Sequence, residues 1–429
     1  MNFLSMSSRS MTSRSMTSVP MRSVKTVSWL VILALVGASI AQAPHHAASP
    51  SKKGKAAPSA KTHYYGAVDL GSKGTKAALY SFVTEDEGRN PVVIYNKTIN
   101  TKLVSSMKDG KFTKEGIDDA VDAVKQVVDG MKAEAAKQNI NVDLFYVVGS
   151  SGVAKATNKD ELVAGVKAAT GIDMDFVDAA REGYYGLLSA VPLSRRPSSM
   201  YIDIGSGNGK LGCLVGDADL HNFKSAEIPY GSVSGRNEAL KRNPRDLNAG
   251  IESVVQDVND AYEKQSRDVP CLRNRQRIYW TGGAAWATAT FMHPERELNG
   301  WVTITKHDLD TFIAELKDGT WNTKKPVFAF PKETSTDEQT IKQDKAREAA
   351  IRQKAMKERD DVQNVFVRED LLAGVSIMRA VLNSSNPSAT IRFVRSGNFI
   401  YGYALEKFKE EGSKETAQVA PRRSVQAAR

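Results

Sequence analysis

One pattern occurs twice in this chain of 429 residues, and it constrains the fold more than any other feature. It reads Asp-(Leu or Ile)-Gly-Ser-x-x-x-Lys, and its two copies are Asp69–Lys76 and Asp203–Lys210. Short apolar segments flank both copies, at 66–68 and 77–80 and again at 200–202 and 211–215. Two apolar strands joined by a polar, glycine-rich turn are typical of a β-hairpin. The shared context predicts a chain built from two similar halves.

Short apolar segments alternate with amphipathic segments along both halves. In the first half the pattern predicts strands at 65–70, 77–83, 92–97, 144–148 and 174–177, and helices at 114–137, 160–169 and 179–190. In the second half it predicts helices at 246–264, 284–291, 306–316, 369–382 and about 400–409, and a strand at 390–394. This alternation is typical of the α/β fold class.

The two ends of the chain differ in composition from its middle. Basic residues precede the apolar run 29–40 and the small residues 41–43, as in a secretory signal peptide or an uncleaved membrane anchor at 1–43. Residues 44–62 are rich in Ala, Ser, Pro and Lys, which predicts a disordered tether. We expect folded halves at 63–192 and 198–410, and a disordered tail at 411–429. Export, to the periplasm or the extracellular space, is the expected location.

The formal net charge of +10 belongs to those ends. Residues 1–63 contain no Asp or Glu, whereas the middle of the chain is nearly neutral. We therefore expect no DNA binding. Segment 324–361 is dense in both charges, which predicts a solvated helix or insertion, with a partner-binding role as the alternative.

The two cysteines, Cys213 and Cys271, lie far apart and form no CxxC motif. This spacing excludes a zinc ribbon, an iron–sulfur site and a framework of several disulfides. A single disulfide between the two cysteines remains an alternative.

Both hairpin turns combine glycines with an aspartate at the strand end, which suits phosphate and metal binding. Glycines permit positive φ and let backbone N–H groups converge on phosphate oxygens, while the carboxylate can hold a hydrated Mg²⁺. The alternative is that Asp and Gly serve turn geometry alone. A dinucleotide fingerprint is disfavoured because strands follow the glycines, and a P-loop is disfavoured because Leu211 replaces its Ser or Thr.

Three further features lie near these hairpins in the sequence. Gly149–Gly152 and the pair Gly282-Gly283 each join an expected strand to an expected helix, where N–H groups can face an anion. Their alternatives are an ordinary turn and close helix–strand packing. Glu182 begins a helix before the second hairpin, where it would orient or deprotonate an attacking water, or complement the helix dipole.

Taken in order, these motifs resemble the exopolyphosphatase and guanosine-pentaphosphate phosphatase (Ppx/GppA) family of the actin-like ATPase superfamily. The resemblance covers about residues 64–409 and rests on the segments 67–76, 149–158, 181–183, 201–207, 228–233, 281–283 and 370–377. It implies two duplicated actin-like ATPase (ribonuclease H-like) domains, at 63–192 and 198–410, facing a phosphate-binding cleft.

The resemblance also implies hydrolysis of a terminal phosphoanhydride by water, assisted by Mg²⁺. It places Glu182 as the catalytic residue and Asp69 and Asp203 as metal ligands. It places phosphate-binding positions at Gly71, Ser72, Lys76, Gly205, Gly207, Gly282 and Gly283. We expect the neighbouring Ser151, Ser206, Asn208 and Lys210 to bind phosphate as well. The implied substrate is inorganic polyphosphate or a phosphorylated nucleotide. The oligomeric state stays open, and a homodimer is one option. A membrane tether through the N-terminal segment is a separate option.

The second hairpin departs from the family pattern D-(I/L)-G-G-G-S-x-E. Ser206, Asn208 and Lys210 stand where the family has Gly, Ser and Glu. The positive charge of Lys210 would either expel the metal or bind phosphate itself. Two alternatives therefore stand beside the hydrolase: a catalytically weakened polyphosphate- or nucleotide-binding protein, and an apyrase-like nucleotidase.

Overall fold

The computed structural model describes residues 61–72, 74–84, 91–104, 106–216, 220–296, 300–330, 336–395 and 398–419. The expected signal or anchor, most of the expected tether and residues 420–429 of the expected tail lie outside these ranges. The last helix, α12 (Phe399–Val419), continues past residue 411, where the tail was expected to begin. No helix within the described ranges is both long and apolar enough to cross a membrane.

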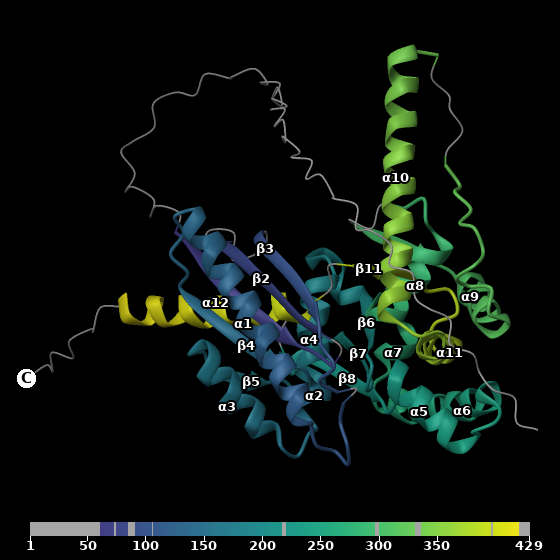
Figure 1. Ribbon diagram of the computed structural model, residues 1–429, viewed down its shortest axis with the longest axis horizontal. Coiled ribbons are helices and arrows are strands. Elements are labelled where there is room, and N and C mark those ends of the chain that lie inside the picture. The colour runs from purple at the N-terminus through teal and green to yellow at the C-terminus, as the bar shows by residue number, and fades with distance from the viewer. Residues whose placement is uncertain are drawn as a thin grey trace, which may run out of the picture. The chain divides into compact units, whose positions relative to one another are not determined.

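The first sheet has five strands in the order β3-β2-β1-β4-β5 (Figure 1). Strands β1 and β2 form the first predicted hairpin, and β4 and β5 add in parallel beyond β1. Helices α1 and α3 cover one face and share an aliphatic core with the sheet. The elements are β1 (Thr62–Leu70), β2 (Gly74–Val83), β3 (Val92–Asn100), α1 (Lys114–Lys137), β4 (Leu144–Gly149), α2 (Ser151–Ala154), α3 (Lys159–Thr170) and β5 (Met174–Phe176).

The second sheet repeats this order and adds one edge strand. It runs β10-β11-β9-β6-β7-β8, so β8-β7-β6-β9-β11 corresponds to β3-β2-β1-β4-β5. The hairpin is antiparallel and the strand beside β6 is parallel, as in the first sheet. The strands are β6 (Ser199–Ile204), β7 (Gly209–Leu214), β8 (Phe223–Ile228), β9 (Arg277–Thr281), β10 (Trp301–Ile304) and β11 (Thr390–Val394). The predicted duplication is therefore confirmed.

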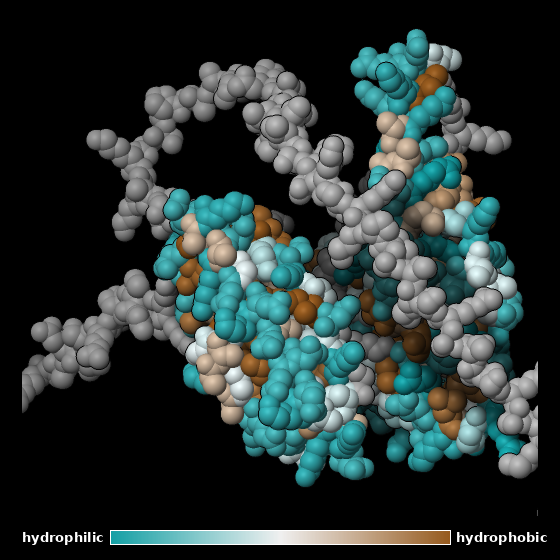
Figure 2. Space-filling model, in the orientation of Figure 1, coloured by the Kyte–Doolittle hydropathy of each residue, from teal (hydrophilic) through white to brown (hydrophobic). Residues whose placement is uncertain are grey.

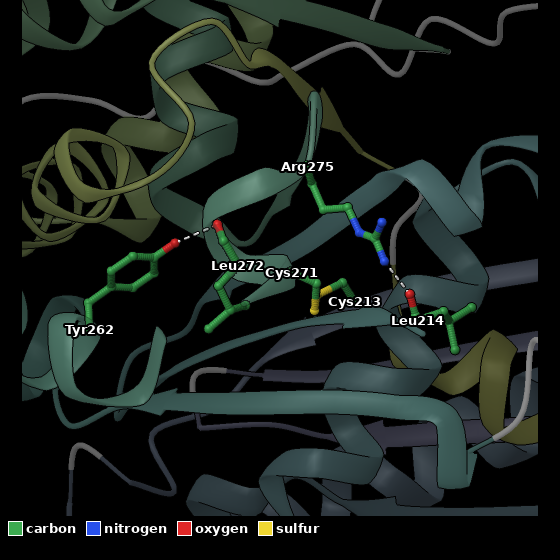
Figure 3. The surroundings of a disulfide bond; sticks show 6 residues. All are labelled: Cys213, Leu214, Tyr262, Cys271, Leu272 and Arg275. Atoms are coloured by element: carbon green, nitrogen blue, oxygen red, sulfur yellow. Dashed lines mark hydrogen bonds between the residues drawn. A yellow bond between two sulfur atoms is a disulfide. The ribbon is translucent and has the colours of Figure 1, made fainter. Parts of the chain in front are cut away.

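Helices around the second sheet share a hydrophobic core with it, which contains Trp280, the largest fully buried side chain among the described residues. They are α5 (Ser232–Arg242), α6 (Leu247–Asp268), α7 (Cys271–Asn274), α8 (Gly283–Met292), α9 (Lys306–Asp318) and α11 (Arg368–Ser384). The two cysteines form a disulfide that ties β7 to α7 (Figure 3). The carbonyl of Leu272 accepts a hydrogen bond from Tyr262 Oη at 2.8 Å, and Arg275 donates to the carbonyl of Leu214. The disulfide left open by the sequence is thus present.

Two helices are exchanged between the halves. Helix α4 (Ala179–Ala190), expected in the first half, contacts β6, β7 and β8 of the second sheet. Helix α12, expected in the second half, contacts β1 of the first sheet as well as α4. An aromatic core containing Tyr65, Tyr185 and Tyr201 joins these elements. The described residues belong to one compact unit, so the boundaries at 192 and 198 stay a prediction.

Short 3-10 helices cover the expected linker, at η1 (Leu193–Ser198), and the β7–β8 connection, at η2 (Leu220–Asn222).

Most of the charged segment at 324–361 forms the long helix α10 (Glu338–Val365). Its N-terminal half is exposed, and its buried residues, Ala355, Glu358, Arg359 and Val362, lie toward its C-terminal end. Figure 2 shows largely hydrophilic side chains over the exposed part of this helix. The expectation of a solvated helix is confirmed for that part.

Candidate active site between two hairpins

The two hairpins have the same backbone geometry at their turns. Asp69 pairs with Lys76 across β1 and β2, and Asp203 pairs with Lys210 across β6 and β7. The N–H of Gly71 donates to the carbonyl of Gly74 at 2.9 Å, and the N–H of Gly205 donates to that of Asn208 at 3.0 Å. The repeated sequence pattern therefore produces the same turn twice.

The expectation of positive φ at the turn glycines needs correction. Among the described residues, Gly71, Gly74, Gly205 and Gly207 do not have positive φ, whereas Gly282 has φ of 95°. The close approach of Lys210 accounts for glycine at position 205, because a Cβ there would lie 3.1 Å from Nζ of Lys210. Glycine thus makes room at this turn rather than permitting a left-handed backbone.

A buried ion pair joins the second hairpin to α4. Nζ of Lys210 lies 2.8 Å from Oε1 of Glu182 and 3.5 Å from Oδ2 of Asp203. Oε2 of Glu182 accepts a hydrogen bond from the backbone N–H of Ser151 at 2.9 Å. Asp178 caps α4 by accepting from the N–H of Arg181, which fixes Glu182 in the first turn of the helix. Residues from α2, α4, β6 and β7 therefore meet at one point.

This ion pair is fully charged at neutral pH. Burial alone would raise the pKa of Glu182, but the charge of Lys210 and hydrogen bonds from Lys210 and Ser151 lower it below its usual value. Burial alone would lower the pKa of Lys210, but Glu182 and Asp203 raise it well above its usual value. Each group is thus held charged by the other.

Asp69 of the first hairpin is buried like Glu182, but it has a more distant and more exposed cationic partner. Its Oδ2 lies 3.9 Å from Nζ of Lys76, a side chain that is 54% exposed. Burial raises the pKa of Asp69 to about 7. The charges of Lys76 and Lys210 oppose this rise, whereas the charges of Glu182 and Asp203 add to it. Its Oδ1 has no hydrogen-bond partner among the described residues. Oδ1 of Asp69 is therefore a buried acceptor without a partner in the described part of the chain, the kind of atom that a bound ligand can satisfy.

Asn208 has a structural contact where phosphate binding was predicted. Its Nδ2 donates to Oε1 of Glu227 on β8 at 2.6 Å. The same oxygen lies 3.0 Å from Nζ of Lys155, at the end of α2. Asn208 and Glu227 therefore connect the second turn to the first half.

The N-terminus of α5 is hydrogen-bonded to the second turn. The N–H of Ser232 donates to the carbonyl of Gly205, and those of Val233 and Ser234 donate to the carbonyl of Ser206. Oγ of Ser234 donates to the carbonyl of Gly207 at 2.7 Å. The sequence did not predict that α5 stabilises this turn. The small and polar residues of the Gly-Ser-Val-Ser-Gly segment 231–235 were the available signal for that role.

The glycine pair after β9 has two separate roles. A Cβ at Gly282 would lie 2.6 Å from Oδ1 of Asp203, so glycine is needed for this loop to approach the carboxylate. A Cβ at Gly283 would lie 2.3 Å from the ring of Phe366, which matches the helix-packing alternative. On the first half, Ser72 approaches α2, with Oγ 3.1 Å from the position of a Cβ at Gly152.

The residues present do not fit the Mg²⁺ site that the resemblance implies. The ammonium of Lys210 already lies between Glu182 and Asp203, where it would repel a divalent cation. Mg²⁺ therefore stays a prediction from the resemblance alone.

Two cavities lie away from this cluster. A small one is lined by residues of α8, the loop after it and α10, including His293 and Lys354. An open one of about 490 Å³ lies between α1 and α3, beside Asp118 and Glu161. The buried carboxylates of the candidate site are instead bordered by the partly exposed turns at Gly71-Ser72 and Gly205–Gly207.

No family model matches the sequence, and no curated protein matches it. Solved structures do match. A Ppx/GppA family member from Aquifex aeolicus aligns at 14% identity and a TM-score of 0.54, over 82% of this chain and 99% of that one. An exopolyphosphatase from Cytophaga hutchinsonii aligns at 16% identity and a TM-score of 0.57, over 81% of this chain and 98% of that one. The chain therefore has the fold of these Ppx/GppA structures, as its sequence motifs predicted.

Proposed function

We propose that this protein hydrolyses a terminal phosphoanhydride bond of inorganic polyphosphate or of a phosphorylated nucleotide. One observation carries the proposal: Glu182 and Lys210, which are buried, and Asp203 converge beside two glycine turns of identical geometry. The fold supports it, because the similar structures include an exopolyphosphatase. The substrate class comes from that likeness and from the phosphate-binding logic of the turns.

In this mechanism a water attacks the terminal phosphorus, and the bond from that phosphorus to the bridging oxygen breaks. Glu182 orients the water and accepts its proton, and the shortened chain leaves with the bridging oxygen. Lys76, Lys210 and backbone N–H groups of the turns balance the charge of the transferred group. A lowered pKa at Glu182 is compatible with this role, because phosphoryl transfer depends more on positioning and charge than on base strength.

Glu182→Gln tests the proposal. Because the amide keeps the shape of the side chain but cannot accept the proton, phosphate release should fall by about 10²- to 10⁴-fold. The assay measures orthophosphate released by the full chain from inorganic polyphosphate and from a nucleoside triphosphate. Glu252→Gln is a matched control, because Glu252 is an exposed residue of α6 that pairs only loosely with Lys317. Unchanged release in Glu182→Gln would remove Glu182 from the mechanism.

A second candidate function is phosphate binding without turnover. The contact between Glu182 and Lys210 favours it, because a carboxylate engaged by an ammonium and an N–H is less available to water. Calorimetry would then detect polyphosphate binding to a protein that releases no phosphate. The same two substrates also separate a polyphosphatase from an apyrase-like nucleotidase.

We further propose that the protein acts outside the cytoplasm. The Cys213–Cys271 disulfide supports export, since such bonds persist in oxidising compartments. Alkylation of the protein without reduction, followed by mass measurement, should detect no free thiol. Two alkylated cysteines would contradict this location. The homodimer and the N-terminal tether stay predictions.

A further inference from the structure

A cation already lies among the carboxylates of the candidate site, and the chain itself supplies it. The ammonium of Lys210 is enclosed by β6, β7 and α4, and its side chain is only 6% exposed. We propose that Lys210 is the resident cation of this site and that terminal phosphate binds there without a divalent metal ion. This inference rests on the proposed function, because it assumes that phosphate binds at the two turns.

The position of the ammonium is the first support. It lies 2.8 Å from Glu182 and 3.5 Å from Asp203, so it bridges two acidic groups as a metal ion would. It also lies directly under the second turn, 3.1 Å from where a Cβ of Gly205 would be. An ammonium has three N–H donors, which lets it hold both carboxylates and one phosphoryl oxygen together.

The charge balance of the site is the second support. A cluster of carboxylates repels phosphate, and a bridging metal is the usual means of overcoming that repulsion. Here Lys210 faces Glu182 and Asp203, and Lys76 faces Asp69. Two lysines from equivalent hairpin positions thus offset most of the acidic charge. An entering anion therefore meets less repulsion than three unpaired carboxylates would cause.

The cost of displacing Lys210 is the third support. A metal could reach Glu182 and Asp203 only if the buried lysine left both carboxylates. Its aliphatic stem packs beside Gly183, where a Cβ would lie 3.7 Å from Cβ of Lys210. Displacement would leave the buried ammonium of Lys210 without a partner, which is strongly unfavourable and opposes the entry of a hydrated divalent ion.

Calorimetry on the full chain tests the inference, with inorganic polyphosphate of defined length as the probe. One titration is done in EDTA and the other in millimolar MgCl₂. We expect the two dissociation constants to agree within about threefold. Affinity at least about tenfold weaker in EDTA would overturn the inference and leave the proposed function standing. Absence of binding in both buffers would overturn the proposed function and the inference with it.

A second measurement follows metal binding directly. Equilibrium dialysis with Mn²⁺ should show no saturable site in the wild-type chain and one in Lys210→Glu, where a third carboxylate joins Glu182 and Asp203. Lys224→Glu is the matched control, because Lys224 is an exposed residue of β8. A saturable Mn²⁺ site in the wild-type chain would contradict the inference even if Lys210→Glu failed to fold.

Discussion

The two hairpins share a sequence pattern, a strand register and a turn hydrogen bond, yet their lysines differ in exposure and in the additional partner that only Lys210 has. The Lys76 side chain is 54% exposed and lies 3.9 Å from Asp69, whereas that of Lys210 is 6% exposed and 2.8 Å from Glu182. The difference comes from the neighbours. Helix α4 brings Glu182 to the second hairpin, and α5 holds its turn. The same local sequence therefore gives a solvent-facing cation in one half and a buried counter-ion in the other.

Replacing each lysine with methionine should separate the two environments most clearly. Lys210→Met leaves Glu182 and Asp203 without their cation, so the free energy of unfolding should fall by about 3–5 kcal/mol. Lys76→Met removes a contact of 3.9 Å from a lysine that is half exposed, and it should cost less than about 1 kcal/mol. Urea unfolding at neutral pH measures both. Equal losses would refute the contrast between the hairpins.

Asp69 should make stability depend on pH. Its pKa is about 7 in the folded chain against 3.8 as its ordinary value, so the folded state binds more protons between these values. The free energy of unfolding should therefore fall as the pH rises from 4 to 7. Asp69→Asn should match the wild type near pH 4 and exceed it at pH 8 by up to about 4 kcal/mol, at about 1.4 kcal/mol per pK unit. Parallel pH–stability curves for the two proteins would argue against this burial cost.

The disulfide is a second difference between the hairpins, because it ties β7, but not β2, to a neighbouring helix. The bond closes a sequence separation of 58 residues. Replacing both cysteines with serine should lower the free energy of unfolding by about 2–4 kcal/mol, mainly through the entropy of the unfolded chain. Reduction of the wild-type protein should lower its free energy of unfolding by a similar amount. Insensitivity to reductant would show that the cross-link contributes nothing to the second half.

The smallest effect is expected where the halves touch through Lys155 and Glu227. Both side chains are substantially exposed, at 60% and 42%, so their ion pair should contribute less than about 1 kcal/mol. Lys155→Ala, Glu227→Gln and the double variant form a cycle that isolates the pair from the Asn208 contact. A coupling above 2 kcal/mol would mean that this link is screened from water.

Local features of the sequence were sufficient for much of the fold. Helices at 114–137 and 179–190 have the predicted bounds. Strand β8, helix α5 and edge strand β10 were not predicted, since each is short and weakly patterned. The placement of Glu182 and Asp203 at one point followed from the repeat and the resemblance. The Lys210–Glu182 ion pair did not, because it depends on α4 crossing to the second sheet.

The exchange of α4 and α12 bears on the order in which a nascent chain can fold. Phe408 of α12 stacks on Phe82 of β2 at a ring distance of 5.2 Å and meets Tyr65 of β1 edge-on. Ribosomes release β1 and β2 early, but they release α12 only near the end of synthesis. Until then the aromatic face of the first sheet lacks its cover and is exposed to aggregation. A stalled or truncated translation product would therefore be a substrate for chaperones rather than a functional half.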